Sequence, residues 1–186
     1  DSTLPIIKTA STFSCSLASN EVKCWGNSGF GQLGIGSLTT QITPQPVSFG
    51  FGAYATEISL GYGEHACAII NDGSARCWGD GESGRIGDGT GDNKQSPSPV
   101  AFSQKFASNT TATAISAGDK HTCAILNYGN VSCWGRGYGS AIGIPLNNND
   151  QNFPQPTNSL GVGRTAVNIS LGYQFACVLL DNGLVS

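Results

Sequence analysis

Seven cysteines recur along this 186-residue chain with a period of about fifty residues. Six of them form three close pairs, and the first cysteines of successive repeats are 52, 56 and 54 residues apart, at Cys15, Cys67, Cys123 and Cys177. A fixed period of this length is typical of propellers and solenoids, in which each repeat buries its apolar face against its neighbours. The period therefore predicts an array of similar units along the whole chain.

A polar turn between two β-prone segments predicts that each cysteine pair brackets a β-hairpin. Between Cys67 and Cys77, three apolar residues at 68–70 lead into the turn Asn71-Asp72-Gly73. A three-residue turn with glycine last is typical of a type I turn followed by a left-handed residue, a conformation that glycine adopts without strain. Glycine recurs at this place in the next two repeats, as Gly129 and Gly183.

Such a turn places the two cysteines of each repeat directly opposite each other. The first repeat has one residue fewer between its cysteines, and a two-residue turn at Ser19-Asn20 restores the opposition. Directly opposed residues have Cβ atoms about 4.5–5.5 Å apart, close enough for a disulfide after small adjustment. We predict three disulfides and expect the partner of Cys177 one residue beyond Ser186; the predicted pairs are Cys15–Cys24, Cys67–Cys77 and Cys123–Cys133.

Zinc binding is the competing interpretation of paired cysteines. Zinc motifs place roughly two to four residues between ligands and need a second pair nearby, whereas the pairs here are 9 or 10 positions apart. The spacing favours disulfides. Because structural disulfides persist in oxidising compartments, it also predicts an extracellular protein, either secreted or at the cell surface.

The rest of each repeat is also β-like and rich in turns. A β-prone segment precedes the first cysteine, at 55–60, 113–117 and 166–171. After the second cysteine come Trp-Gly, beginning at Trp25, Trp78 and Trp134, and a glycine-rich turn, beginning at Asn27, Asp80 and Arg136. Proline-bearing connectors follow at 43–47, 96–100 and 153–157. Three or four short strands per unit, with no helical periodicity, predict the blades of an all-β propeller.

This combination resembles the repeats of the regulator of chromosome condensation family. The resemblance rests on the elements ending in His-x-Cys-Ala-Ile at Gly61–Ile69 and Gly118–Ile125, on Trp-Gly, and on Gly-Gln-Leu-Gly-Ile-Gly at Gly31–Gly36. It implies that residues 1–186 form part of a β-propeller, in a ring of seven blades of about 50 residues. The repeats are predicted around residues 6–50, 51–108 and 109–164, with an incomplete one at 165–186.

Composition excludes two classes of function. The net charge is −3 and the nine Lys and Arg residues are scattered, so no basic patch for nucleic acid is expected. No apolar run approaches the roughly 18–20 residues of a membrane span. The partners we expect are other protein subunits, the remaining blades of the ring, and glycans.

No catalytic apparatus is predicted. His65 and His121, the only histidines, occupy the same place in successive repeats, which favours a structural role, and no acyl-transfer triad is supported. Two segments match the pattern Gly-x-Gly-x-x-Gly, at Gly29–Gly34 and Gly79–Gly84. A dinucleotide site needs a helix directly after this pattern, and no helix is predicted after either segment. The repeated tryptophans favour blade packing over a carbohydrate platform. We therefore predict that the chain is not an enzyme and needs no cofactor.

Two sets of polar residues remain as candidate sites. A loop carries the densest acidic stretch and is a weak calcium candidate, although its spacing is not that of an EF-hand and a solvated loop is favoured; its acidic residues are Asp80, Glu82, Asp88 and Asp92. Three Asn-x-Ser/Thr sequons are candidate N-glycan sites in a secreted protein, at Asn109, Asn130 and Asn168.

Taken together, these patterns predict a rigid extracellular propeller that works by binding. We expect a structural or interaction subunit of a surface or matrix assembly such as a filament. The alternatives are a secreted protein-binding or glycan-binding module, or an enzyme inhibitor, with the same fold.

Overall fold

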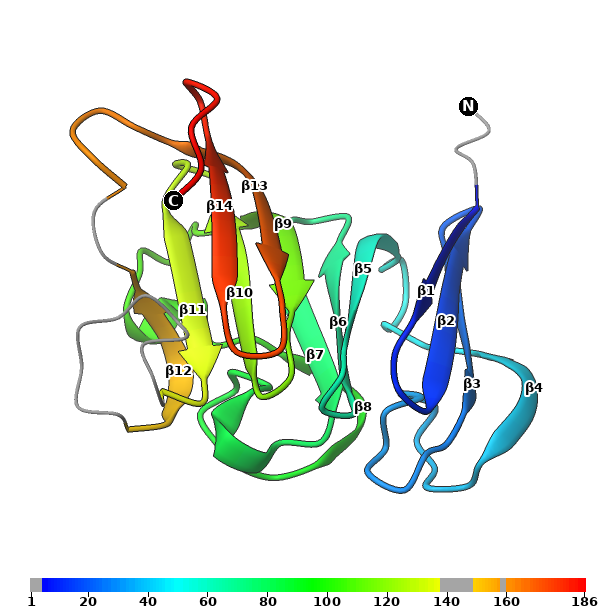
Figure 1. Ribbon diagram of the computed structural model, residues 1–186. Helices are drawn as coiled ribbons and strands as arrows, with labels where there is room; N and C mark the ends of the chain where they lie inside the picture. The colour runs from blue at the N-terminus through cyan, green and yellow to red at the C-terminus, as the bar shows by residue number, and fades with distance from the viewer. Residues whose placement is uncertain (1–4, 138–148, 158–159) are drawn as a thin grey trace.

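The computed structural model describes residues 5–137, 149–157 and 160–186 and shows an all-β protein (Figure 1). Three four-stranded antiparallel sheets and one two-stranded sheet follow one another along the chain. Strand order within each sheet is chain order, so every sheet is a meander built from one continuous segment. The only helices in the described residues are two 3-10 turns, η1 Glu82–Gly84 and η2 Phe102–Gln104, and neither is long and apolar enough to cross a membrane.

We call the sheets blades 1 to 4. Blade 1 contains β1 Ile6–Thr9, β2 Phe13–Ala18, β3 Glu21–Gly26 and β4 Gln41–Pro46. Blade 2 contains β5 Ala55–Gly61, β6 His65–Ile70, β7 Ala75–Gly79 and β8 Lys94–Pro99. Blade 3 contains β9 Ala112–Ala117, β10 His121–Leu126, β11 Val131–Gly135 and β12 Gln151–Pro156. Blade 4 contains β13 Ala166–Leu171 and β14 Ala176–Leu180.

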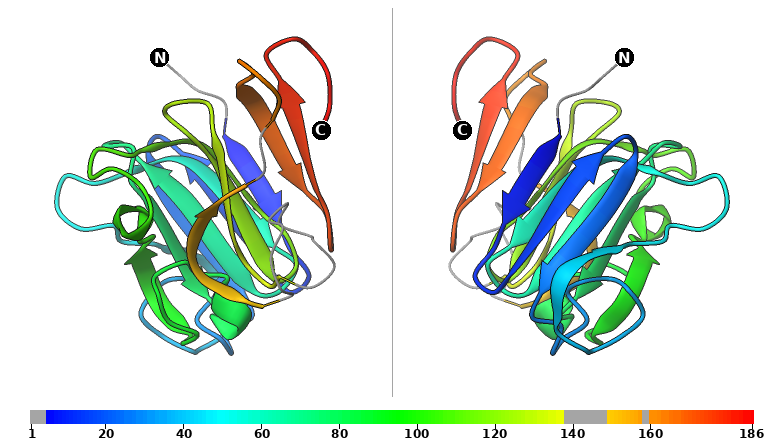
Figure 2. Two further views of the ribbon diagram at one scale, coloured as in Figure 1. Left: turned by 90° about the vertical axis from the view of Figure 1, so that its left-hand side faces the viewer. Right: turned by 90° about the vertical axis from the view of Figure 1, so that its right-hand side faces the viewer.

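The blades stack face to face as an arc of a β-propeller. The first strands of successive blades contact one another, β1 with β5, β5 with β9, and β9 with β13, so they form the inner edge of the arc. The fourth strands β4, β8 and β12 are the outer edges. Figure 2 shows the twisted sheets lying one behind another in the two side views. This architecture confirms the predicted all-β propeller fold.

The proline-bearing segments predicted as connectors lie mostly on the outer strands β4, β8 and β12, where prolines interrupt the free edge of each sheet. Val47, Val100 and Thr157 each donate their backbone N–H inward, to the third strand of the same blade. The backbone N–H groups of a strand point alternately to its two sides, so the nitrogens one and three residues before these donors face the free edge. Proline occupies both positions in every blade, as Pro44 and Pro46, Pro97 and Pro99, and Pro154 and Pro156. A proline edge offers no N–H to another strand and so resists edge-to-edge aggregation.

The apolar core is divided into three layers, one at each junction between blades. The layer between blades 1 and 2 includes Phe13, Ala66 and Trp78, and equivalent layers lie between blades 2 and 3 and between blades 3 and 4. Every residue of β6 and β10 is buried, because both faces of those strands are covered. In β2 burial alternates, because a blade covers only one face. The arc therefore has an open face at each end.

Candidate functional site: the junctions between blades

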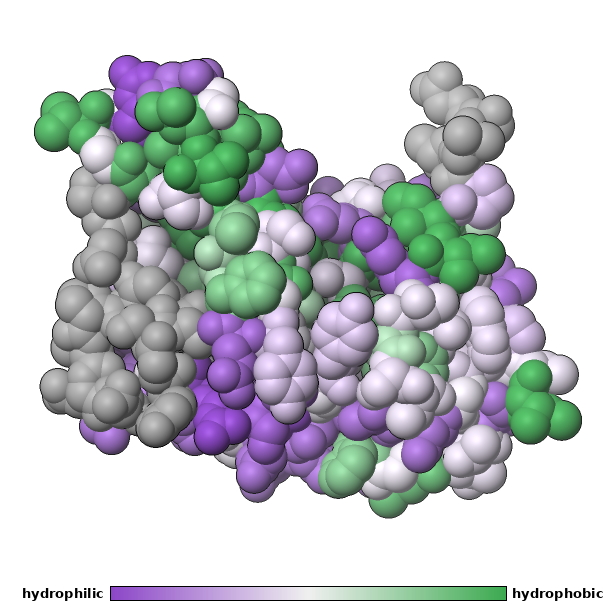
Figure 3. All heavy atoms as spheres, viewed as in Figure 1, coloured by the Kyte–Doolittle hydropathy of each residue, from purple (hydrophilic) through white to green (hydrophobic). Residues whose placement is uncertain are grey.

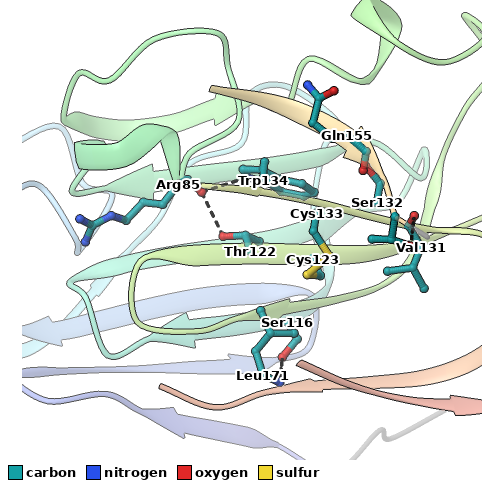
Figure 4. The surroundings of a disulfide bond; sticks show 11 residues. Arg85, Ser116, Thr122, Cys123, Val131, Ser132, Cys133, Trp134, Gln155 and Leu171 are labelled. Carbon is teal, nitrogen blue, oxygen red and sulfur yellow. Dashed lines mark hydrogen bonds between the residues drawn. A yellow bond between two sulfur atoms is a disulfide. The ribbon is translucent and has the colours of Figure 1, made fainter. Parts of the chain in front are cut away.

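The paired cysteines face each other across the second and third strands of blades 1 to 3. Disulfides join them with Cα–Cα distances of 4.1, 4.0 and 4.1 Å, in the pairs Cys15–Cys24, Cys67–Cys77 and Cys123–Cys133. All six are buried in the layer that meets the following blade, and Figure 4 shows the third pair. Cys177 occupies the same register position in blade 4, where it is exposed and unbonded.

The glycine-rich turn of one blade caps the tryptophan of the next. Trp78 Nε1 donates to the Gln32 carbonyl at 3.0 Å, and Trp134 Nε1 donates to the Arg85 carbonyl at 2.9 Å (Figure 4). A Cβ at Gly34 or Gly87 would lie only 2.7 or 2.5 Å from the indole nitrogen, and both glycines have positive φ. The first Gly-x-Gly-x-x-Gly pattern thus ends at a glycine that packs on an indole, Gly34, whereas in the next repeat the equivalent glycine is Gly87, outside the pattern Gly79–Gly84. The second pattern contains the 3-10 turn η1 and no α-helix. The turn predicted from Arg136 lies mostly outside the described residues.

His65 belongs to a buried polar chain between blades 2 and 3. The Thr122 hydroxyl donates its single proton to the Arg85 carbonyl at 3.0 Å, so the 3.0 Å contact with His65 requires the imidazole Nε2 to donate. Burial, followed by the nearby charges of Arg85 and His121, holds the pKa of His65 well below its ordinary value. His65 Nδ1 has no hydrogen-bond partner among the described residues. The imidazole is therefore neutral and interlocks the two blades.

His121 occupies the same place one blade later. Burial lowers its pKa, and a hydrogen bond to the Phe175 backbone and the charge of Asp119 act in the opposite direction. In blades 1 and 4 the position is taken by Phe13 and Phe175, and the Phe13 side chain is buried. A position that accepts either phenylalanine or neutral histidine has a packing role, because phenylalanine cannot transfer a proton.

Arg85 is a buried charge that sequence patterns did not single out. Its side chain is 1% exposed and forms ion pairs of 3.1 Å with both Asp80 and Glu82. It also donates from Nη1 to the Gly63 carbonyl, and Lys120 of blade 3 contacts Glu82 at 2.8 Å. The hydrogen bond and charge of Lys120, with a smaller effect from Arg85, lower the pKa of Glu82. The only signal in the sequence is that Gly-Arg-Ile-Gly in this repeat replaces Gly-Gln-Leu-Gly.

The acidic loop is divided between two different partners. Asp80 and Glu82 surround Arg85, whereas Asp88 contacts Lys94 at 2.9 Å and accepts hydrogen bonds from Thr90. Burial of Asp88 raises its pKa, but its hydrogen bonds outweigh burial and the net shift is downward. Within the described ranges no group of three or more His, Cys, Asp or Glu side chains could hold a metal ion. The weak calcium candidate therefore gains no support.

A different cluster closes the junction between blades 1 and 2. The Glu64 carboxylate, on the loop between β5 and β6, accepts hydrogen bonds from three neutral side chains. The donors are Ser11 at 2.6 Å, Thr12 at 2.5 Å and Gln32 at 2.6 Å. Glu64 has φ +64°, so the loop holds a non-glycine residue in the left-handed region to reach them. No pattern in the sequence indicated this cluster.

Hydrogen bonds from side chain to backbone also connect the inner strands. Ser59 Oγ accepts from the Ala117 N–H, and Glu57 accepts from the Ile115 N–H, both across the junction between blades 2 and 3. Burial raises the pKa of Glu57, opposed by the Ile115 hydrogen bond and the charge of Lys8. No side-chain hydrogen bond joins β1 to β5 within the described part of the chain.

The three sequons lie at separate exposed places. Asn109 is in the loop after η2, Asn130 is at the end of the turn between β10 and β11, and Asn168 is on β13. The hydroxyl of Ser132, the third residue of the Asn130 sequon, is buried and donates to the Gln155 carbonyl. None of the asparagines contributes to the histidine or arginine clusters.

Four-stranded blades that repeat a capped tryptophan, a glycine-rich turn and an interlocking aromatic residue define a β-propeller made of sequence repeats. Family models for the regulator of chromosome condensation (RCC1) repeat match residues 20–69 and 72–125, and a second model of the same description matches residues 112–139. The chain belongs to this family, as its motifs predicted.

One curated relative supports this assignment, and two solved structures share the fold. The ultraviolet-B receptor UVR8 of Arabidopsis thaliana is 33% identical over 138 residues, which cover 74% of this chain and 30% of the receptor. Prp20p of Saccharomyces cerevisiae has a similar structure, with TM-score 0.81, 17% identity, and coverage of 93% of this chain and 42% of Prp20p. The ectodomain of the Physcomitrella patens receptor kinase CR4 gives TM-score 0.58 and 18% identity, with coverage of 97% and 39%. The chain thus spans less than half of each.

Proposed function

We propose that this chain is a non-catalytic interaction subunit of an extracellular assembly, such as a surface filament or matrix. The observation that carries the proposal is the set of three buried disulfides, each at a junction between blades. Disulfides persist in oxidising environments, and small loops closed by them stabilise a domain by about 2–4 kcal/mol each. The charge of −3 and the scattered cations favour protein or glycan partners over nucleic acid.

The absence of a catalytic site is part of the same proposal. The buried histidines are neutral and pack between blades. Three of the four carboxylates of the acidic loop, Asp80, Glu82 and Asp88, are paired with Arg85, Lys94 or Lys120. RCC1 repeats build protein-interaction propellers, and a rigid arc of this kind presents loops on two faces for contacts. The four repeats proposed from the sequence, within residues 1–186, supply these loops.

Glycans at Asn109 and Asn130 would fit an extracellular subunit. Both side chains are exposed, and both lie at loops or turns away from the disulfides. A glycan at either place would extend into solvent without entering a junction between blades.

A secreted binding module is the second candidate. Tyr62 and Tyr173 lie on equivalent loops of blades 2 and 4 and are 58% and 60% exposed, which suits contact with a protein or a glycan. The CR4 ectodomain, a receptor segment, shares the propeller fold. An inhibitor of an enzyme would use the same kind of surface.

Two measurements on the protein from its source test the proposal. Alkylation without reductant, followed by mass spectrometry, should find the six paired cysteines oxidised; free thiols at all six would overturn the extracellular assignment. Light scattering without reductant should find a large assembly. A monodisperse particle of one subunit that captures a defined ligand would instead favour the secreted binding module.

A further inference from the structure

The open face of blade 4 repeats the positions that join the other blades together. Ser59, Ser116 and Ser170 occupy one register position on the innermost strands β5, β9 and β13. Each lies opposite the first cysteine of its own repeat, which is Cys67, Cys123 or Cys177. The three serines should therefore make the same contact with the next blade wherever a blade covers them.

Two of these serines have a visible partner. Ser59 Oγ accepts the Ala117 N–H and Ser116 Oγ accepts the Leu171 N–H, both at 3.0 Å, and Figure 4 shows the second bond. Ala117 and Leu171 are themselves equivalent, because each directly follows the serine of the next blade. Ser170 is exposed on β13, with no blade in the structure against it.

A second acceptor lies two residues before the serine. In blades 2, 3 and 4 a register shift leaves one extra residue ahead of this position, which is occupied by Glu57, Ala114 and Asn168. Only Glu57 and Asn168 carry a side-chain acceptor there. Glu57 Oε1 accepts the Ile115 N–H of the next blade at 3.2 Å. Asn168 takes the same place, and among the described residues its Oδ1 accepts a hydrogen bond only from the neighbouring Ile169 N–H, at 2.7 Å.

The apolar residues on this face are equally uncovered. Phe175 and Leu179 are 60% and 38% exposed, whereas His65 and Ile69, their equivalents in blade 2, are 0% and 4% exposed. Figure 3 shows hydrophobic surface gathered over β13, β14 and the turn that follows them. Contiguous exposed apolar surface of this kind marks a contact site.

We propose that Ser170 and Asn168 accept backbone N–H groups from the innermost strand of a further blade of the same polypeptide, and that Asn168 therefore carries no glycan in the folded protein. The argument is continuity with the established junctions: each of blades 1 to 3 is covered by the blade that follows it in the chain. UVR8 and Prp20p are also longer than this chain. An N-glycan on Asn168 would occupy the space of the covering strand.

Serine substitutions in the full polypeptide, as its source makes it, test the hydrogen bonds. Ser116→Ala breaks an observed part-buried hydrogen bond and should lower the melting temperature by about 1–3 °C, since the shift for one lost bond becomes smaller as the chain becomes longer. Ser170→Ala should cause a drop of the same size, and Ser170→Thr, which keeps the hydroxyl, should restore most of it. Ser103→Ala, at an exposed residue of η2, is the matched control and should cause no shift.

A silent Ser170→Ala beside a destabilising Ser116→Ala would overturn the proposal. A Ser170→Ala effect that grows with protein concentration would also overturn it, because the covering blade would then belong to a second copy. Glycopeptide mass spectrometry of the secreted protein supplies an independent readout. The peptide with Asn168 should be unmodified, and a glycan found there in folded protein would contradict the assignment.

Discussion

The junction between blades 1 and 2 and the junction between blades 2 and 3 solve one packing problem with different polar chemistry. In both junctions the earlier blade contributes a buried disulfide and the later blade contributes a buried tryptophan. The indole N–H of that tryptophan donates to a carbonyl in the glycine-rich turn of the earlier blade. The first junction closes with the Glu64 carboxylate and neutral donors. The second uses the buried Arg85, its two carboxylates and the chain from His65 to Thr122.

The difference shows which positions the repeat constrains and which it leaves free. Tryptophan, cysteine and the turn glycines recur because each fits a space bounded by backbone, as at Gly34 and Gly87 beneath the indoles. The residue after the second turn glycine is Gln32 in one repeat and Arg85 in the next, because only its carbonyl is used by the tryptophan. Its side chain is free to be neutral or ionic.

The largest expected effect comes from making the second junction resemble the first. Arg85→Gln should lower the free energy of unfolding by about 3 kcal/mol, because it leaves the carboxylates of Asp80 and Glu82 without their buried cation. Urea unfolding measures the loss. Arg164→Gln breaks an exposed pair with Asp181 and should cost less than about 1 kcal/mol. Equal losses in the two variants would show that burial of Arg85 adds nothing.

The two tryptophan caps should differ in cost. Trp78→Phe leaves the Gln32 carbonyl without the indole donor and should cost about 1–3 kcal/mol. Trp134→Phe should cost about 1 kcal/mol, because the Thr122 hydroxyl still donates to the Arg85 carbonyl. Trp25 of blade 1 is only half-buried at the open end of the arc, so Trp25→Phe in the 186-residue chain should stay within about 0.5 kcal/mol. Chemical denaturation of the three variants tests the ranking, and an effect at Trp25 as large as at Trp134 would contradict it.

Acid should weaken the second junction before the first. The pKa of His65 is lower in the folded protein than the ordinary 6.5, so the unfolded chain binds the proton more readily and stability falls as the pH drops below about 6.5. The loss approaches about 1.4 kcal/mol per pH unit for one such histidine. His65→Phe, which copies blades 1 and 4, should flatten the decline between about pH 6.5 and 5.

Other titrating groups also contribute to the pH dependence of stability. Burial lowers the pKa of His121 too, so part of the decline in unfolding free energy at low pH should remain in His65→Phe. The lowered pKa values of Glu82 and Asp72 make their stabilisation disappear only in stronger acid, as the pH falls through those values. Glu57 has the opposite sign, because its raised pKa makes acid favour the folded state. If folding left the pKa of His65 at its ordinary value, the unfolding free energy would fall with pH equally steeply in His65→Phe and in the unmodified protein, which would contradict the prediction.

The smallest effect belongs to the first junction. Glu64→Gln keeps one acceptor oxygen, for Thr12 and Gln32, and loses the one that Ser11 uses. It should change the free energy of unfolding by less than about 1 kcal/mol, since the Ser11 hydrogen bond is exposed and water can replace it. Glu64→Ala should cost about 1 kcal/mol through lost hydrogen bonds. Urea unfolding measures both variants. If Glu64→Gln lowered the free energy of unfolding as much as Arg85→Gln does, the predicted difference between the two junctions would be wrong.

The sequence by itself determined the blade. The period of the cysteines, the length of the hairpin turns and the position of Trp-Gly are local patterns, and the hydrogen bonding of hairpins follows from them directly. The proline-bearing segments were wrongly predicted as connectors: they form the outer strands, because proline is tolerated at the edge of a sheet. The disulfide pairs of blades 1 to 3 follow from the same register. The equivalence of His65 and His121 was also visible, as was their structural role.

Only the tertiary structure decided how the blades interlock. Arg85 lies on blade 2 and packs beside Lys120 of blade 3, and Glu64 reaches donors more than thirty residues earlier in the chain, so no local pattern could reveal either cluster. Ser59, Ser116 and Ser170 are ordinary strand residues until the next inner strand brings its N–H groups against them. These polar residues become buried only when blades stack, and only then do they form hydrogen bonds and ion pairs between blades.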